Sequence, residues 1–253
     1  MGFETQTIEH QLAHRSIREF TDEKIPQDML EAFLDVANRT ATSTGMQSFS
    51  IVRVTDPGIR KQVADVCRQE YVTRVAELFI FIVDVYRNAR IAEERGCTAK
   101  SRGDMDRFFQ GYADAMLAAQ NLTNAVESAG LGAVYFGSIL NDPAAIVRIL
   151  KLPELTFPAV GVGFGYPNQD PMAKPRMPVA MKVFENEYKR FDAYLPQIAD
   201  YDKVMQGYYD LRENGKRADS FSEQVVKRLE NTIPARAELL RVARAQGFDL
   251  GLE

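Results

Sequence analysis

The spacing of apolar residues predicts a mixture of amphipathic helices and buried strands in the first half of the chain. Within residues 26–39, apolar side chains recur at helical spacing, and Pro26 suits a first helical turn. Runs of β-branched and aromatic residues at 49–55 and 78–85 predict two strands, because such side chains favour the pleated surface of a sheet. The second run is apolar enough to be fully buried.

A long segment at 104–129 predicts a central helix. It is apolar or small almost all round, and Gly130 follows it as a natural C-terminal cap. A helix that opens at residues 141–143 lies between predicted strands at 133–136 and 157–164. Helices and strands do not alternate regularly, so the pattern favours an α+β fold over a doubly wound parallel sheet.

Beyond residue 185 the chain becomes polar and helical, with apolar stripes that need a further surface to pack on. No repeat or linker marks a domain boundary, so we predict a single domain over residues 1–253, in which residues 185–253 form a helical extension. The apolar helix and this extension together predict a homodimer in which the extension embraces the partner subunit. The stripes consist of Tyr201, Val204, Tyr208, Val225, Val226 and Leu229.

Composition and charge narrow the possible functions. A net charge of -4 argues against a general nucleic-acid binder, which needs a basic surface for the phosphate backbone. The longest strictly apolar stretch is residues 78–83, far short of the roughly 20 residues that cross a bilayer. The N-terminal residues lack a basic start followed by an apolar region. We therefore expect a cytoplasmic protein that does not enter the membrane.

Two short basic clusters are candidates for binding a phosphate. The first combines Arg15, Ser16 and Arg18 with His14, and the second places Lys174 and Arg176 on either side of a proline. Guanidinium groups bind phosphate oxygens bidentately. Taken one at a time, each cluster is better explained as solvated surface charge. A phosphate site requires the two clusters, far apart in sequence, to meet in the fold.

Other candidate motifs lack the context that their chemistry needs. The glycines at 161, 163 and 165 lie inside an apolar strand and precede no helix, so close packing explains them better than a dinucleotide site. His10 and His14 are four residues apart, but no third ligand accompanies them, and we predict no metal site. No GxxxxGK[ST] or GxSxG motif occurs.

Four segments together resemble the nitroreductase family. They are HRSIREFTDEKIP at 14–26, TATSTGMQS at 40–48, GLGAVYFGSI at 130–139 and KPRMP at 174–178. Their order and spacing are most similar to the branch of NADPH-dependent oxygen-insensitive nitroreductases and FMN reductases. The resemblance implies an α+β fold with a central antiparallel sheet flanked by helices. It also implies an intertwined homodimer with FMN near the subunit interface.

The same resemblance implies which residues bind the cofactors. In the FMN site, His14, Arg15, Ser16 and Arg18 would hold the phosphate and part of the flavin, Lys174 and Arg176 would complete this basic pocket, Thr42 and Gln69 would lie at the flavin, and Tyr135, Phe136, Gly137 and Ser138 would form the loop beside its ring. For NADPH, Arg212 and Arg217 match two arginines that contact the 2'-phosphate, and Lys216 adds a third cation. A solvated interhelical loop is the alternative explanation of these three cations.

The resemblance implies an FMN-containing, NADPH-dependent oxidoreductase that reduces nitroaromatics, quinones or flavins by a ping-pong hydride-transfer mechanism. Because the flavin carries the chemistry, no catalytic protein residue is predicted. Two alternatives remain open, a dedicated flavin reductase that supplies reduced FMN to a partner and a flavin-binding redox sensor with little turnover. Gly137-Ser138 replaces paired glycines of relatives, and Thr44-Gly45 replaces an aromatic residue, so the substrate preference stays open.

Overall fold

The computed structural model describes residues 5–212 and 219–249, and these divide into two compact units. The first unit comprises residues 1–171 and 233–253, and the second comprises residues 172–232. The helices of the first unit are α1 (Gln6–Leu12), α2 (Gln27–Asn38), α3 (Pro57–Cys67), α4 (Tyr86–Glu94), α5 (Met105–Ser128), α6 (Pro143–Ile149), α9 (Pro234–Ala237) and α10 (Leu239–Ala245). Its strands are β1 (Phe49–Arg53), β2 (Glu77–Asp84), β3 (Gly132–Phe136) and β4 (Thr156–Gly165).

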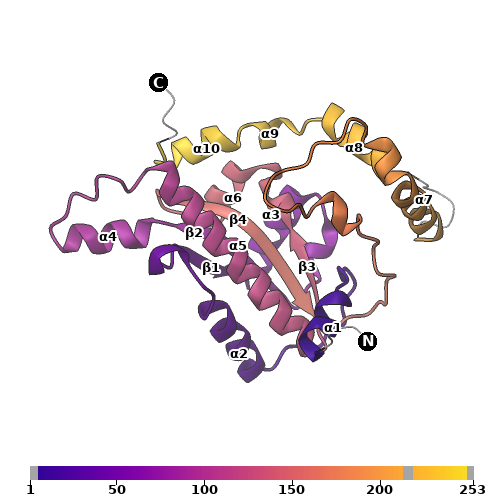
Figure 1. Ribbon diagram of the computed structural model, residues 1–253. Coiled ribbons are helices and arrows are strands. Elements are labelled where there is room, and N and C mark those ends of the chain that lie inside the picture. Colours follow the sequence, from indigo (N-terminus) through magenta and orange to yellow (C-terminus); the bar gives the residue numbers. More distant parts are fainter. Residues whose placement is uncertain (1–4, 213–218, 250–253) are drawn as a thin grey trace. The chain divides into compact units, whose positions relative to one another are not determined.

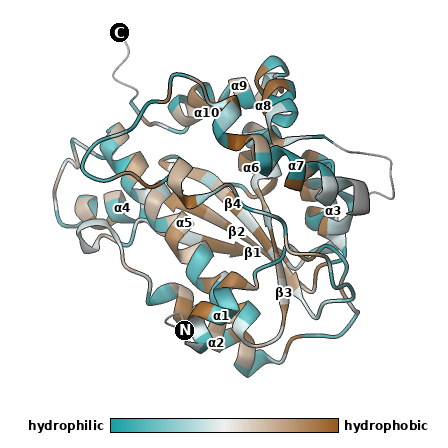
Figure 2. Ribbon diagram, turned by 45° about the vertical axis from the view of Figure 1, so that its right-hand side comes forward, coloured by the Kyte–Doolittle hydropathy of each residue, from teal (hydrophilic) through white to brown (hydrophobic). Residues whose placement is uncertain are grey.

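The four strands form one antiparallel sheet in the order β1-β2-β4-β3 (Figure 1). The two central strands, β2 and β4, are buried along their whole length, as their apolar sequences predict. In Figure 2 these strands form the most hydrophobic part of the ribbon. The predicted α+β class with a central antiparallel sheet is therefore confirmed.

Helices cover both faces of the sheet, and the alternation of side chains along β2 shows how. Phe79 and Phe81 point to one face, where they pack in a core cluster with α2 and α5. Leu78, Ile80 and Ile82 point to the other face and pack in a second cluster with residues of α3, α6 and α10. The sheet is thus the middle layer of three, and α5 crosses one face of it (Figure 1).

The predicted helices and strands begin and end within about two residues of the observed ones, because the capping residues at the predicted helix ends act as caps in the structure. Asp104 and Ala129 flank the ends of α5 as caps, and the Asp142 side chain accepts a hydrogen bond from the amide of Ala145 at the start of α6. At Gly163 an added Cβ would lie 2.6 Å from the Phe136 ring, so close packing does explain the glycines of β4.

The second unit contains α7 (Leu195–Arg212) and α8 (Phe221–Glu230). Two residues of the predicted apolar stripes, Tyr201 and Tyr208, pack here with Met205 and Tyr209. By contrast, Leu229 on α8 remains 81% exposed, so this part of the stripe has no described partner within the unit. Whether the extension embraces another subunit stays a prediction.

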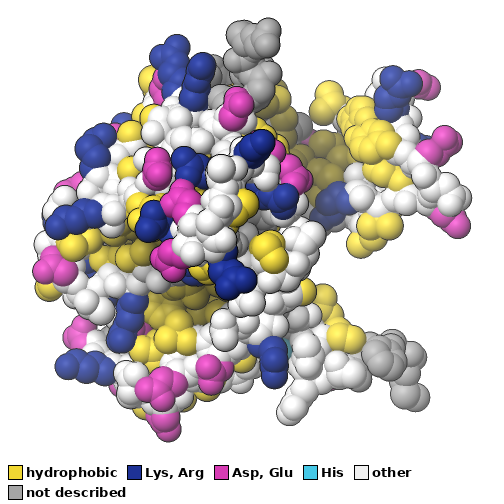
Figure 3. Space-filling view, turned by 90° about the vertical axis from the view of Figure 1, so that its left-hand side faces the viewer, with side chains coloured by type: hydrophobic (Ala, Val, Ile, Leu, Met, Phe, Trp, Pro, Cys, Tyr) yellow, Lys and Arg dark blue, Asp and Glu magenta, His cyan; other side chains and the backbone are white. Residues whose placement is uncertain are grey.

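No helix within residues 5–212 and 219–249 combines the length and the apolar character of a membrane span. Charged side chains of both signs are interspersed on the face drawn in Figure 3, and apolar side chains reach the surface between them.

Candidate functional site

The first basic cluster, at residues 14–18, lies along the edge of the sheet where β3 begins. Ser16 forms a parallel bridge with Ala133, and the amide of Ile17 donates to the Ala133 carbonyl at 3.0 Å. The Ile17 side chain is buried, and its neighbours in an extended segment therefore face the opposite way. Gly132 permits this packing, because a Cβ there would lie 2.5 Å from Ile17. Ser16 and Arg18 are consequently presented together as half-buried polar side chains.

Carboxylates hold two members of this cluster. The Nδ1 atom of His14 lies 2.7 Å from a carboxylate oxygen of Glu127, near the end of α5, and Nε2 of His10 lies 4.0 Å from the other oxygen. Arg15 donates to the carboxylate of Asp170, whose side chain is 89% exposed. Around these groups lies a cavity of about 240 Å³ that is lined by both histidines, Arg15, Glu127 and Asp170. The sequence showed Glu127 only as a polar residue in an apolar helix, and it showed no signal for Asp170.

Arg18 differs from Arg15 in having no hydrogen bond or ion pair within the described ranges 5–212 and 219–249. A half-buried guanidinium without an anion retains its full capacity for a bidentate contact. Arg15 is paired only through an exposed carboxylate, which a more strongly bound anion displaces at little cost. The Ser16 hydroxyl and the Arg18 guanidinium, which face the same way, are donors of the kind that bind a phosphate monoester.

At the other end of β3, two further predicted residues meet. The Ser138 hydroxyl donates a hydrogen bond of 2.7 Å to Oε1 of Gln69, although the two residues are far apart in sequence. Gln69 reaches this position because Arg68, the C-cap of α3, adopts a left-handed conformation with φ 53°, and the chain then turns toward β3. Ser138, which replaces a glycine of the resembled family, therefore binds another site residue.

Gly137 leaves the backbone open beside this pair. No heavy atom outside its chain neighbours lies within 4 Å of a Cβ built there, and the residue is exposed. Its carbonyl accepts a hydrogen bond of 3.1 Å from Nη1 of Arg236, which comes from the C-terminal segment and which the sequence analysis missed. Phe136, in contrast, is fully buried and supports the loop from below.

Tyr135 points from β3 toward α5. Its hydroxyl donates to Oε1 of Gln120 at 3.1 Å. Burial raises the pKa of Tyr135, and a hydrogen bond with Thr123 opposes that shift. The phenol is therefore a neutral donor at physiological pH.

The five residues of β3 separate the Ser16 end from the Gly137 end by roughly 15 Å. Phosphate-binding groups lie at the first end, and an open backbone with amide and hydroxyl groups lies at the second. This is the order of groups along an extended flavin mononucleotide. The donors present therefore fit FMN, whose phosphate Ser16 and Arg18 would bind and whose ring would lie near Gly137.

Thr42 lies on a separate loop that α5 also supports. The amide of Ser43 donates to Asp114 at 2.8 Å. Asp114 and Glu127 are 13 positions apart on α5, which corresponds to about 20 Å along the helix axis. One helix thus fixes two segments of the predicted site, and neither carboxylate was predicted from the sequence.

The remaining predicted residues belong to the second unit. Lys174 Nζ lies 5.6 Å from the centre of the Tyr209 ring, and Arg176 donates to the Lys174 carbonyl at 2.8 Å. Their meeting with the first basic cluster stays a prediction. Arg212 is the last residue of α7, while Lys216 and Arg217 lie outside the described residues.

Two family models match this chain. The model described as "Nitroreductase family" matches residues 12–166, and that described as "Nitroreductase family, C-terminal domain" matches residues 174–251. The chain is 34% identical to an FMN reductase (NADPH) of Bacillus subtilis over 87% of its length and 90% of the relative's. It is 35% identical to an oxygen-insensitive NADPH nitroreductase of Salmonella typhimurium over 88% of its length and 90% of the relative's.

Solved structures agree with these relatives. Nitroreductase A of Vibrio parahaemolyticus superposes with a TM-score of 0.87 at 33% identity, covering 97% of this chain and 99% of the other. An NADPH:FMN oxidoreductase of Vibrio harveyi, complexed with NAD⁺, superposes with a TM-score of 0.86 at 33% identity, covering 96% and 99%. The likeness extends over both units of the chain.

Proposed function

Because this chain belongs to the nitroreductase family, we propose that it is an NADPH-dependent oxidoreductase that uses FMN to reduce nitroaromatics, quinones or flavins. The observation that carries the proposal is the ordered donor set along β3. Ser16 and Arg18, which has no partner among the described residues, lie at one end, and the Gln69–Ser138 pair lies beside the open backbone of Gly137 at the other. The same proposal places the enzyme in the cytoplasm.

When bound, FMN supplies the redox chemistry by accepting a hydride from NADPH and passing electrons to the acceptor. The chain's own residues bind and orient. Arg18, Arg15 and Ser16 would hold the phosphate, and Lys174 and Arg176 of the second unit would add further charge to it. Gln69 and Ser138 would fix polar groups at the ring, and the neutral Tyr135 phenol would stay a hydrogen-bond donor to Gln120.

Steady-state kinetics test this function. One open flavin face must serve NADPH and the acceptor in turn, so we expect ping-pong behaviour. Double-reciprocal plots against NADPH at several quinone or nitrofurazone concentrations should be parallel. Intersecting lines would contradict the shared face.

An enzyme that consumes added FMN stoichiometrically, with no bound flavin through turnover, would instead be a dedicated flavin reductase. Absence of NADPH oxidation with either acceptor, in protein that binds FMN, would favour a redox sensor.

A homodimer is part of the proposal, and an apolar stripe on α5 supports it. Phe109, Ala113, Met116 and Leu117 recur at helical spacing on the face turned away from the sheet, and all four are exposed. The Phe109 side chain is 66% exposed. A stripe of this kind on a helix usually marks an interface, and family membership favours a second copy as its partner.

Leu117→Glu is expected to weaken the dimer more than a hundredfold. Burial of one leucine contributes about 1.5–3 kcal/mol, and a twofold interface contains the substitution twice. Sedimentation velocity and bound FMN should show monomers that have lost most of their flavin. Leu240→Glu on α10 is the matched control, because that leucine is 55% exposed against 51% for Leu117. A Leu117→Glu protein that stays dimeric at micromolar concentration would refute this interface.

A further inference from the structure

The loop between Thr42 and β1 has an unusual backbone. Thr44, Gly45 and Gln47 adopt left-handed conformations with φ of 50°, 72° and 51°. Only glycine reaches this region without strain, and a β-branched residue such as Thr44 is disfavoured there. Such conformations persist when surrounding contacts determine them, and they are frequent at functional sites.

A buried carboxylate on α5 supplies the first of these contacts. One oxygen of Asp114 accepts the amide of Ser43 at 2.8 Å, and the other accepts the amide of Ser48 at 3.0 Å. The residue is only 1% exposed. A buried charge is stable where donors satisfy it, so the two ends of the loop and this carboxylate depend on one another.

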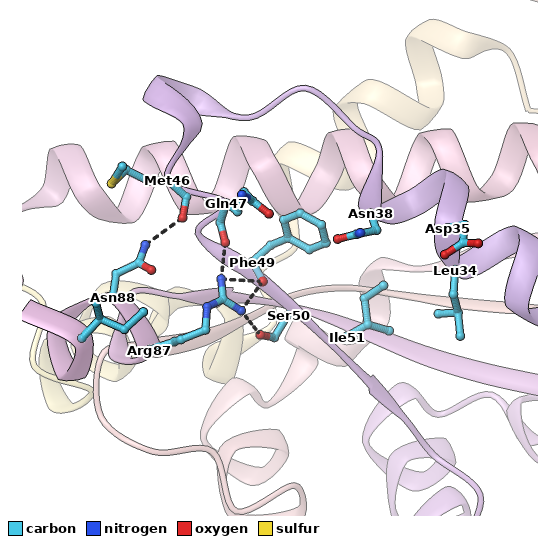
Figure 4. A pocket seen from close by; sticks show the side chains of 11 residues that line it. Leu34, Asp35, Asn38, Met46, Gln47, Phe49, Ser50, Ile51, Arg87 and Asn88 are labelled. Atoms are coloured by element: carbon cyan, nitrogen blue, oxygen red, sulfur yellow. Dashed lines mark hydrogen bonds between the residues drawn. The ribbon is translucent and has the colours of Figure 1, made fainter.

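Helix α4 holds the loop from its other side through the carbonyl groups (Figure 4). Asn88 donates to the Met46 carbonyl at 2.9 Å, and Arg87 donates to the carbonyls of Gln47 and Phe49. These residues also line a pocket of about 570 Å³. Amides bound to α5 and carbonyls bound to α4 thus hold the loop from two sides.

Thr42 directly precedes the loop that these contacts with α4 and α5 hold. It is half-buried and has an extended backbone with φ −130°. Its hydroxyl makes no hydrogen bond to any residue in the ranges that the structure describes. Because Asp114 accepts the amide of Ser43, one peptide unit away, the carboxylate restrains the backbone that carries this hydroxyl.

We propose that Asp114 is a positioning residue of the FMN site, which fixes the Thr42 loop so that the Thr42 hydroxyl is oriented toward the flavin. The inference rests on the proposed function. In Asp114→Asn, the side chain keeps its shape but has one acceptor for two amides, so one end of the loop is released.

A double-mutant cycle on FMN affinity separates positioning from general stabilisation. The dissociation constant is measured on apoprotein by quenching of FMN fluorescence, for wild type, Thr42→Val, Asp114→Asn and the double variant. We expect Asp114→Asn to raise it about tenfold and Thr42→Val about threefold to tenfold. The double variant should bind as weakly as Asp114→Asn alone. In Asp114→Asn the misplaced Thr42 hydroxyl no longer contributes to FMN binding, so its removal causes no further loss of affinity.

Asp106→Asn is the control, since it makes the same chemical change on the same helix at a side chain that is 68% exposed, and its FMN affinity should equal that of the wild type. The inference would be overturned if the FMN dissociation constant of the double variant rose by the product of the two single effects. It would also be overturned if Asp114→Asn bound FMN as tightly as the wild type. A wild type that does not bind FMN would instead overturn the proposed function and this inference with it.

If Asp114→Asn does not fold, Asn88→Ala replaces it in the cycle. This change releases the Met46 carbonyl at the opposite side of the loop without opening the core. We expect Asn88→Ala to raise the FMN dissociation constant about threefold. Adding Thr42→Val to it should again not multiply the two effects. Full multiplication of the two effects would overturn the inference in this form also.

Discussion

Arg18→Ala is expected to raise the FMN dissociation constant roughly tenfold to hundredfold. A hydrogen bond to a charged group contributes about 1.5–3 kcal/mol, and a factor of ten corresponds to about 1.4 kcal/mol. Arg18 has no ion pair within the described part of the chain, so its removal breaks no internal bond there. The free energy of unfolding of the apoprotein should therefore change by less than about 0.5 kcal/mol. Equilibrium titration with FMN and urea unfolding of the apoprotein measure the two quantities.

Two further variants sharpen this prediction. Arg18→Lys keeps the charge but loses the planar pair of donors, and its FMN affinity should fall between those of wild type and Arg18→Ala. Arg241→Ala removes an arginine whose side chain is 84% exposed and whose partner is Glu238, and it should leave affinity unchanged. Equal affinity in wild type and Arg18→Ala would place the phosphate elsewhere.

Arg212→Ala and Arg217→Ala are each expected to lower kcat/KM for NADPH roughly tenfold to hundredfold, with little change in kcat at saturation. A contact to the 2'-phosphate is remote from the transferred hydride, so it contributes to ground state and transition state alike. One charge-assisted contact contributes about 1.5–3 kcal/mol. Activity with NADH, which lacks this phosphate, should be nearly unaffected.

A control variant accompanies the comparison of NADPH with NADH. Lys203→Ala removes a cation from α7 that is 76% exposed and paired with Asp200, and it should alter neither cofactor's KM. Higher salt should weaken NADPH binding more in the wild type than in the two arginine variants, because dissolved ions screen charge–charge attraction. Equal losses with NADH and NADPH would show that these arginines do not bind the 2'-phosphate.

The layered fold was largely predictable from sequence, because its main elements bury continuous apolar surface. Helix α5 and the buried strands β2 and β4 were predicted to within two residues. Helix α3 was not predicted, because no element was expected between the strands at 49–55 and 78–85. The structure shows Asp56 as its N-cap, accepting the amide of Ile59, so the signal was present in Asp56-Pro57.

The candidate site was predicted by motif, but its supporting contacts were not. Gln69 and Ser138 were named separately, and only the fold shows that they share a hydrogen bond. The roles of Asp114 and Glu127 depend on which loops reach α5, and helical spacing carries no information about that. A polar residue in an otherwise apolar helix nevertheless marks a position where a buried partner must exist.

This chain is expected to bind FMN and to reduce it with NADPH. The most direct test is a visible absorption spectrum of the purified protein, reconstituted with FMN and freed of excess, before and after NADPH is added without oxygen. We expect bound-flavin absorbance that is bleached by NADPH and returns when a quinone is added. A protein that retains no FMN after reconstitution, or a bound flavin that NADPH leaves unbleached, would contradict this expectation.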